Sequence, residues 1–178
     1  MNLRRLRLRA VWLLILPFLW LCRPTLPLLV VGLALGALGL LVRGWAAGTI
    51  HKERELTTTG PYAHTRNPLY LGSFLLGLGV TLAGGQWWWP LLFLSFYAAV
   101  YGRTMVGEAA LLTELFGERY RLYAANVPSV LPRLTPWRAP DVEGGGFTFA
   151  QYRRNREWEA LLGAVAGFGF LAAKLLLQ

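Results

Sequence analysis

Charged residues are scarce in this chain. They make up 15% of its 178 residues, whereas 55% of the residues are hydrophobic. Because a soluble domain carries about 25% charged residues, a soluble domain with a polar shell is excluded. The 8 tryptophans, 9 phenylalanines and 7 tyrosines exclude a disordered chain, which lacks aromatic side chains to bury. The composition predicts an integral membrane protein in which lipid replaces the polar shell.

Cysteine and histidine are also rare. Cys22 is the only cysteine, which excludes an intrachain disulfide and a site with several cysteine ligands, and we expect it to pack as a small hydrophobic side chain. The two histidines, His51 and His64, have no obvious third ligand, and the HExxH pattern is absent, so no metal site is predicted. P-loop, G-x-S-x-G and G-x-G-x-x-G motifs are absent as well, which excludes the soluble nucleotide-binding folds.

Apolar runs separated by short polar stretches predict an all-α integral membrane protein with about five transmembrane helices. We expect one multi-span domain over residues 1–178, with 43–67 irregular and 133–157 forming a loop. The last helix is an addition at the C-terminal end. The predicted spans are residues 10–22, 28–42 with a continuation towards 47, 68–83, 87–116 and 158–177.

Small and turn-forming residues refine this picture. Gly32, Gly36 and Gly39 lie in the second span and would let another helix approach closely. Pro68 is expected at the first position of the third span, where its missing N–H costs nothing, with Asn67 as the N-cap.

The net charge of +9 is distributed as membrane topology requires. Five spans place 16 of the 18 basic residues on one side, and only Arg23 and Lys174 fall opposite. The positive-inside rule then puts the N-terminus and both long loops in the cytosol, and we expect the inner membrane of a bacterium or archaeon. Because the basic residues form no stripe interleaved with exposed aromatics, a nucleic-acid partner is not predicted. The bilayer is the expected surrounding.

Two polar segments meet at the cytosolic face, and they are the candidates for chemistry. Glu108 lies 21 residues after Trp87, or ~32 Å along a helix, so it returns to the depth of Arg66. The N-terminus of the third helix and Arg66 suit an anion, and Glu108 suits a cation. Structural alternatives exist: Arg66 as a topology anchor, Glu108 paired with Arg103 or Arg119, and His64 and Gly72 as loop and packing residues.

The ordered residues resemble a known family. Gly60-Pro61-Tyr62, followed by Arg66-Asn67-Pro68-x-Tyr70-x-Gly72, is similar to the first signature of the isoprenylcysteine carboxyl methyltransferases and their phospholipid-methyltransferase relatives. The second signature is Glu108, then Phe116-Gly117-x-x-Tyr120-x-x-Tyr123-x-x-x-Val127-Pro128. The likeness covers roughly residues 43–132. It implies a multi-span helical enzyme that uses S-adenosylmethionine, releases S-adenosylhomocysteine, and holds the cofactor at the cytosolic membrane edge.

The resemblance also implies roles for residues. Asn67 stands where many members have histidine, and Ala109 and Asn126 replace often acidic and often basic residues, so a histidine-based proton transfer is not carried over. Arg66, Glu108 and Arg103 are the expected catalytic residues. The expected cofactor-binding residues are Tyr62, His64, Arg66, Asn67, Pro68, Tyr70, Leu71, Gly72, Glu108, Tyr120 and Tyr123.

The same residues indicate which chemical group receives the methyl group. A carboxylate is ionised at pH 7 and needs a cation, which Arg66 or Arg103 could supply, whereas an amine needs a base, for which Glu108 is the candidate. We predict methylation of the carboxylate of an isoprenylcysteine-like lipid that enters from the bilayer. The alternatives are methylation of a phospholipid amine or other small lipid, an NADPH-dependent sterol-type membrane reductase, and a membrane scaffold without catalysis. The cations expected around the site are Arg66, Arg103, Arg119 and Arg121.

Overall fold

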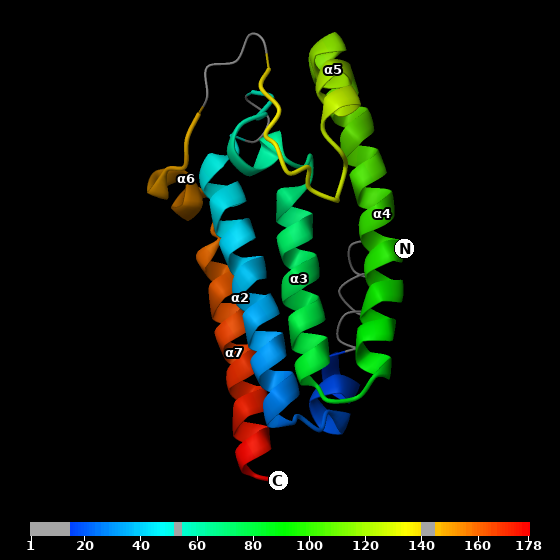
Figure 1. The fold of residues 1–178 in the computed structure, drawn as a ribbon, viewed down its shortest axis with the longest axis vertical. Coiled ribbons are helices and arrows are strands. Elements are labelled where there is room, and N and C mark those ends of the chain that lie inside the picture. The colour runs from blue at the N-terminus through cyan, green and yellow to red at the C-terminus, as the bar shows by residue number, and fades with distance from the viewer. Residues whose placement is uncertain (1–14, 52–54, 140–144) are drawn as a thin grey trace, which may run out of the picture.

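The computed structural model describes residues 15–51, 55–139 and 145–178, and over these residues the protein is helical with irregular connections (Figure 1). Residues 15–21 are helical and lead through a short turn into the first long helix. The further elements are α2 (Leu26–Thr49), the 3-10 turn η1 (Gly60–Ala63), α3 (Pro68–Ala83), α4 (Trp88–Phe116), α5 (Glu118–Asn126), α6 (Phe149–Arg154) and α7 (Trp158–Leu176).

Glycines bring α2 and α3 into backbone contact, as the sequence predicted. A Cβ placed on Gly32 would lie 2.4 Å from the carbonyl oxygen of Gly79, and one on Gly39 would lie 2.6 Å from that of Gly72. Helices in lipid associate through such close packing, because lipid tails are as apolar as their side chains. The third glycine of the pattern, Gly36, faces the ring of Phe168 on α7 instead.

Helix α7 packs on α2 and connects to both ends of the bundle. Phe168 and Leu171 join a buried cluster with Cys22, which is 1% exposed and packs as the small hydrophobe predicted. In the last turn of α7, Lys174 donates hydrogen bonds to the carbonyl oxygens of Leu19 and Trp20 at 2.7 and 2.8 Å. These carbonyls end the helical residues 15–21 and lack partners within that helix, so the ammonium caps it.

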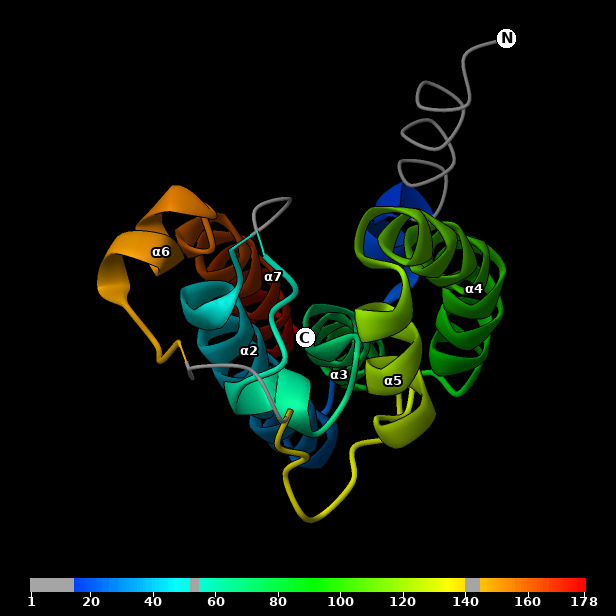
Figure 2. The same cartoon turned by 90° about the horizontal axis from the view of Figure 1, so that it is seen from above.

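Helix α4 stands apart from α2 and reaches the rest of the bundle through α3 (Figure 2). The contact between α3 and α4 is made by aromatic rings: Phe74 lies 6.0 Å from Phe93 and 5.2 Å from Tyr97, centroid to centroid. The helix ends at Gly117, whose φ of +52° suits glycine because it has no Cβ. Helix α5 then folds back towards the end that carries η1.

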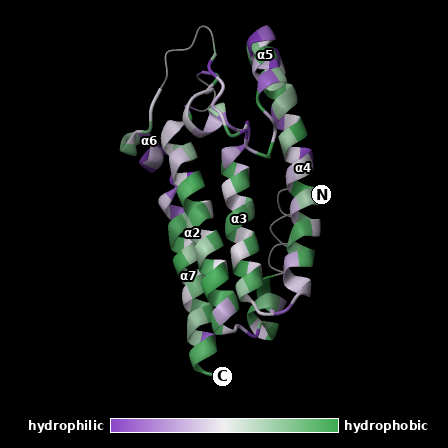
Figure 3. Cartoon of the chain, viewed as in Figure 1, coloured by the Kyte–Doolittle hydropathy of each residue, from purple (hydrophilic) through white to green (hydrophobic). Residues whose placement is uncertain are grey.

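Apolar colour covers the length of the long helices, and polar residues gather at the end that carries η1, α5 and α6 (Figure 3). Among the described residues, α2 and α7 are long and apolar enough to cross a membrane, and α3 is a shorter apolar helix. This is fewer than the five spans expected. Helix α4 forms where predicted but is not among the candidates. Residues 10–14 of the span expected at 10–22 lie outside the described residues.

Three local expectations were wrong. The second helix continues through residue 47, as expected, and runs to Thr49, so the irregular segment begins after Thr49 instead of at residue 43. The connection 133–157 contains α6, whose first turn is capped because the Thr148 side chain accepts a hydrogen bond from the Gln151 N–H. Asn67 occupies the N-cap position of α3 without capping it, because its side-chain amide donates to the Ser129 carbonyl oxygen at 2.9 Å.

Candidate active site

Hydrogen bonds join the two sequence signatures at the polar end of the bundle. The Arg66 N–H donates to the Pro128 carbonyl oxygen at 2.9 Å, and the Tyr123 hydroxyl donates to the Tyr62 carbonyl oxygen at 2.7 Å. Asn67 adds its bond to the segment after α5. Residues from opposite ends of the core therefore form one wall, which positions the start of α3.

His64 is part of this wall. Its Nδ1 lies 2.8 Å from the carbonyl oxygen of Arg133, whose N–H in turn donates to the His64 carbonyl oxygen at 2.9 Å. The neighbouring Thr65 hydroxyl contacts the carbonyl oxygens of Ser129 and Val130, both at 3.1 Å. His64 therefore connects the segment before α3 to the segment after α5.

A cavity of about 510 Å³ lies beside this wall. It is bounded by the end of α2, the segment after it, η1, the first turns of α3, the last turns of α4, and α5. Its lining is partly polar and combines charged groups with aromatic rings. The lining residues are Arg43, Ile50, His51, Glu55, Leu56, Thr57, Tyr62, Arg66, Asn67, Pro68, Leu69, Tyr70, Ser73, Tyr101, Thr104, Glu108, Leu111, Leu112, Phe116 and Tyr123.

Arg66 and Glu108 both line the cavity, as the hairpin of α3 and α4 predicted. The Nη1 of Arg66 donates to the Tyr120 hydroxyl at 3.2 Å. Glu108 accepts a hydrogen bond from the Tyr70 hydroxyl at 2.5 Å. Each charged group thus has a tyrosine as its partner, so the cavity offers a cation and an anion to a ligand that carries both charges.

Three buried polar atoms of cavity-lining residues have no hydrogen-bond partner within the described part of the chain: the Tyr62 hydroxyl, the Nε of Arg66 and the Nδ1 of His51, which lies only within ion-pair distance of Glu55. Buried polar groups normally have a partner, and an exception needs an explanation. Burial, with the nearby Tyr123 hydroxyl and Glu108 carboxylate as smaller causes, raises the pKa of Tyr62 above its usual value. Burial also raises the pKa of Tyr123, against the opposing effect of Arg66. Both hydroxyls are therefore neutral donors at physiological pH.

The cavity gathers some of the sequence-predicted site residues and leaves others outside. Tyr62, Arg66, Asn67, Pro68, Tyr70, Glu108 and Tyr123 line it, whereas His64, Leu71, Gly72, Arg103 and Tyr120 do not. Tyr120 is buried directly behind Arg66. Gly72 lies at the contact with α2, where a Cβ would be 2.5 Å from the Cγ of Arg43. Arg103 is exposed, and of the four cations expected around the site only Arg66 lines the cavity.

Sequence reasoning missed Arg43, Ser73, His51 and Tyr101, all of which line the cavity. Arg43 lies on α2, and its Nη1 donates to the Ser73 hydroxyl and, at 3.4 Å, to the Leu69 carbonyl oxygen on α3. The available signal was a charged residue in a run of apolar ones, which marks a functional position in a membrane helix. The sequence pattern instead predicts that Arg43 begins an irregular segment.

A second cavity, of about 310 Å³ and almost wholly apolar, continues the first between α3 and α4. Ser73 and Tyr101 line both cavities. The apolar cavity reaches down past Phe93 to Trp89 and to Phe18 of the helical residues 15–21. A polar compartment and an apolar compartment are therefore adjacent, with the Arg43–Ser73 hydrogen bond at their boundary.

Among the residues that the structure describes, no group of three His, Cys, Asp or Glu side chains converges in a way that could hold a metal ion.

Comparison with known proteins identifies the family. Residues 28–119 match the phospholipid methyltransferase family. The chain is 34% identical over 82 residues to the protein-S-isoprenylcysteine O-methyltransferase of Schizosaccharomyces pombe, which is 46% of this chain and 35% of that protein. It is also 34% identical over 129 residues to the nickel-cobalt-cadmium resistance protein NccN of Alcaligenes xylosoxydans xylosoxydans, which is 67% of this chain and 55% of that protein.

The chain thus spans between a third and about half of the length of these relatives. No solved structure matches it. The family match covers nearly all of α2 to the start of α5 and includes every lining residue of the two cavities except Ile15, Phe18 and Tyr123. With the signatures joined at one cavity and more than half of the sequence matched, the chain belongs to the phospholipid methyltransferase family of membrane methyltransferases.

Proposed function

We propose that this protein uses S-adenosylmethionine to methylate a carboxylate on an apolar chain, as in an S-isoprenylcysteine. The observation that carries the proposal is the boundary between the two cavities. Ser73 and Tyr101 line both, and Arg43 binds Ser73 there. A lipid whose chain occupied the apolar cavity would place its head group beside a cation, which suits an anionic acceptor.

The polar cavity fits the cofactor by the chemistry of its lining. A zwitterionic amino-acid group finds Arg66 for its carboxylate and Glu108 for its cationic part. The Tyr62 hydroxyl and the Arg66 Nε are buried donors without partners in the described residues, and a bound ligand would satisfy them. Tyr70, Tyr101 and Phe116 provide flat faces for an aromatic base.

When bound, the cofactor supplies a methyl group that is already activated by a positively charged sulfur. The protein therefore contributes mainly position and exclusion of water. Arg43 and Arg66 hold anionic groups in place. Glu108, which accepts the Tyr70 hydrogen bond, would face the cationic part of the cofactor and would then be engaged there instead of acting as a base. A carboxylate acceptor needs no base, because it is ionised at pH 7.

The pH dependence of methyl transfer tests the proposal. With N-acetyl-S-farnesylcysteine as acceptor, the rate should stay nearly constant from pH ~6.5 to ~8.5, because its carboxylate is ionised throughout. With phosphatidylethanolamine, any rate should rise with pH as the free amine accumulates. Transfer of labelled methyl is measured for both acceptors in the same detergent. Transfer to the amine alone, with a rising profile, would contradict the carboxylate proposal.

A second candidate is methylation of a lipid amine on the same scaffold. The observation in its favour is His51, which lines the cavity with its Nδ1 3.1 Å from a carboxylate oxygen of Glu55. A histidine that lines the cavity beside a carboxylate is a candidate base for a protonated acceptor. His51→Gln should abolish transfer to an amine and leave transfer to a carboxylate unchanged, so this variant separates the two candidates.

We also propose that the polar end faces the cytosol of a bacterial or archaeal cell, as the distribution of basic residues predicts. Gly145 is exposed, has open space around its Cα and accepts a hydrogen bond from the Thr59 hydroxyl beside η1. Gln178, at the C-terminus, is exposed at the opposite end (Figure 1). In a Cys22→Ala background, Gly145→Cys should resist an impermeant thiol reagent in intact cells, whereas Gln178→Cys should react. The reverse pattern would overturn the orientation.

A further inference from the structure

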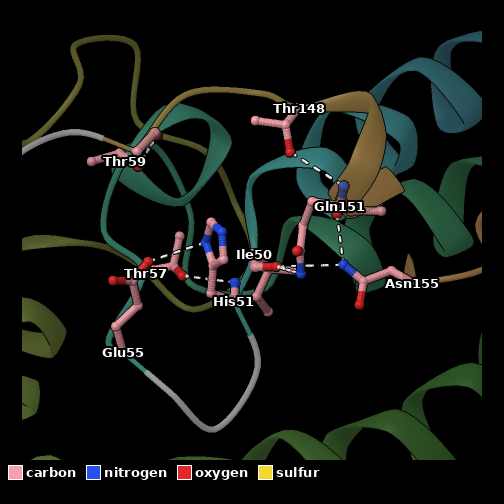
Figure 4. Close-up of polar contacts among 10 residues, drawn as sticks. Ile50, His51, Glu55, Thr57, Thr59, Thr148, Gln151 and Asn155 are labelled. Atoms are coloured by element: carbon pink, nitrogen blue, oxygen red, sulfur yellow. Dashed lines mark hydrogen bonds and ion pairs between the residues drawn. The ribbon is translucent and has the colours of Figure 1, made fainter. Parts of the chain in front are cut away.

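The segment from α6 to the start of α7 binds the end of α2. The Gln151 side-chain amide donates to the Ile50 carbonyl oxygen at 2.5 Å, and the Asn155 amide donates to the Ala47 carbonyl oxygen at 2.7 Å (Figure 4). The last carbonyls of a helix have no partner within it, and here side chains distant in sequence supply the partners. Ile50 and His51 line the polar cavity, so this segment supports a part of the cavity wall.

Glu157, at the N-terminal end of α7, makes the closest contact between this segment and the candidate active site. Its two carboxylate oxygens accept hydrogen bonds from Arg43, from Nε at 2.5 Å and from Nη2 at 3.0 Å. Glu157 is 6% exposed. A paired, bidentate arrangement of this kind has a fixed geometry as well as a favourable energy, so it sets the plane of the guanidinium.

The third nitrogen of the Arg43 guanidinium is also engaged. Nη1 donates to the Ser73 hydroxyl and to the Leu69 carbonyl oxygen. Gly72 leaves room for the Arg43 side chain to cross α3, since a Cβ there would lie 2.5 Å from the Arg43 Cγ. Arg43 is therefore held by α7 on one side and by α3 on the other, at the boundary between the two cavities.

Glu157 itself does not line either cavity. It also lies outside residues 28–119, which match the family. We propose that Glu157 is a positioning residue: the C-terminal segment of this chain acts on acceptor recognition by holding the Arg43 guanidinium in the cavity wall. The inference rests on the proposed function, because it assigns Arg43 to the head group of the acceptor.

Replacing Glu157 by glutamine tests this role, because it keeps the size of the side chain and removes its charge. We expect the Kd of N-acetyl-S-farnesylcysteine, measured by calorimetry with S-adenosylhomocysteine present, to rise about tenfold, and kcat/KM to fall by about the same factor. The Kd of S-adenosylhomocysteine alone should change by less than about twofold. Glu159→Gln is the matched control, since Glu159 is half exposed and pairs with Arg156 away from the cavity, and it should change neither Kd.

A double-mutant cycle shows whether Glu157 acts through Arg43. If it does, Arg43→Met/Glu157→Gln should bind the acceptor as Arg43→Met does, with no further loss. Losses that multiply would overturn the inference. The double variant also leaves no unpaired buried charge. Should Glu157→Gln not fold, Glu157→Asp keeps the charge on a shorter side chain and should still weaken acceptor binding about threefold.

The outcomes separate this inference from the proposed function. Unchanged acceptor affinity and kcat/KM in folded Glu157→Gln and Glu157→Asp, beside an active wild type, would overturn the positioning role alone. A wild type that binds S-adenosylhomocysteine but transfers no methyl group to N-acetyl-S-farnesylcysteine would instead contradict the proposed acceptor.

Discussion

The two sides of α3 differ in how closely they are packed. Towards α2, paired glycines bring the backbones together, so that a Cβ on Gly39 or Gly72 would lie 2.6 Å from a carbonyl oxygen of the other helix. Towards α4, the rings of Phe74, Phe93 and Tyr97 separate the helices, and both cavities open on this side. The closed side fixes where α3 stands, and the open side provides the space in which a ligand can bind.

The closed side should be the more sensitive to substitution. Gly72→Ala would place a methyl group against backbone atoms of Gly39 and against the Arg43 stem, and backbone cannot move aside without shifting a helix. Overpacking of this kind costs about 1–3 kcal/mol, occasionally more. We expect a clearly lowered Tm in detergent together with weakened acceptor binding, because the displaced Arg43 also lines the cavity.

Gly167→Ala is the control for that experiment. Gly167 lies on α7 with open space around its Cα, and alanine is favoured over glycine in a helix by about 1 kcal/mol. Its Tm should stay the same or rise. A Gly72→Ala protein as stable as wild type would show that α2 and α3 can separate without cost, and the contrast between the two sides of α3 would fail.

On the open side, the largest effects should come from Arg66 and Glu108, which are two of the charged residues that line the polar cavity. Arg66→Ala and Glu108→Ala should each weaken binding of S-adenosylhomocysteine by about ten- to hundredfold, since a charge-assisted contact in a partly buried site contributes roughly 1.5–3 kcal/mol. Glu114→Gln, also on α4 but outside the cavity lining, is the control. Calorimetric affinities that stay unchanged in both folded alanine variants would remove these residues from the site.

The apolar cavity should control the length of the lipid chain. At Gly77 a Cβ would meet the far end of the Phe93 ring, at 2.4 Å, and a ring can turn away where backbone cannot. Gly77→Leu should therefore fold and fill part of the cavity. We expect KM to rise about tenfold for a farnesyl acceptor and less for a geranyl acceptor, since each buried CH₂ contributes about 0.8 kcal/mol.

Unchanged binding of S-adenosylhomocysteine by Gly77→Leu would show that the substitution affects the apolar cavity and not the polar one. An equal rise of KM for both chain lengths would contradict the assignment of the apolar cavity to the chain.

Local patterns in the sequence predicted much of this architecture. Pro68 does begin α3, and the glycines of α2 do mark a close helix contact. The number of residues along α4 predicts that Glu108 lies at the same depth as Arg66, and both line the same cavity. Each of these features depends on spacing within one helix or one hairpin, which the sequence displays directly.

Features that depend on distant contacts could not be predicted. Arg43 binds Glu157 across 114 residues, and no local pattern joins the two positions. Gly72 belongs to a motif, yet it contacts Arg43 and Gly39 instead of the cavity, because a motif records which residues occur together and not which of them face a ligand.

Substitution of Arg103 has the smallest expected effect. It tests most directly whether a residue predicted from the sequence faces the cavity. The α4 residues that line the polar cavity are Tyr101, Thr104, Glu108, Leu111, Leu112 and Phe116, and their spacings of three and four mark one face of a helix. Arg103 precedes Glu108 by five residues, about 140° around the helix at 3.6 residues per turn, so it points away from that face. Arg103→Ala should change the Kd of S-adenosylhomocysteine and kcat/KM by less than about twofold, within the range of exposed charges. Measured beside Arg66→Ala, this variant compares two arginines that the sequence predicts as catalytic residues. A tenfold weaker Kd or a tenfold lower kcat/KM in Arg103→Ala would mean that α4 turns during the reaction. The face of α4 assigned to the cavity would then be wrong.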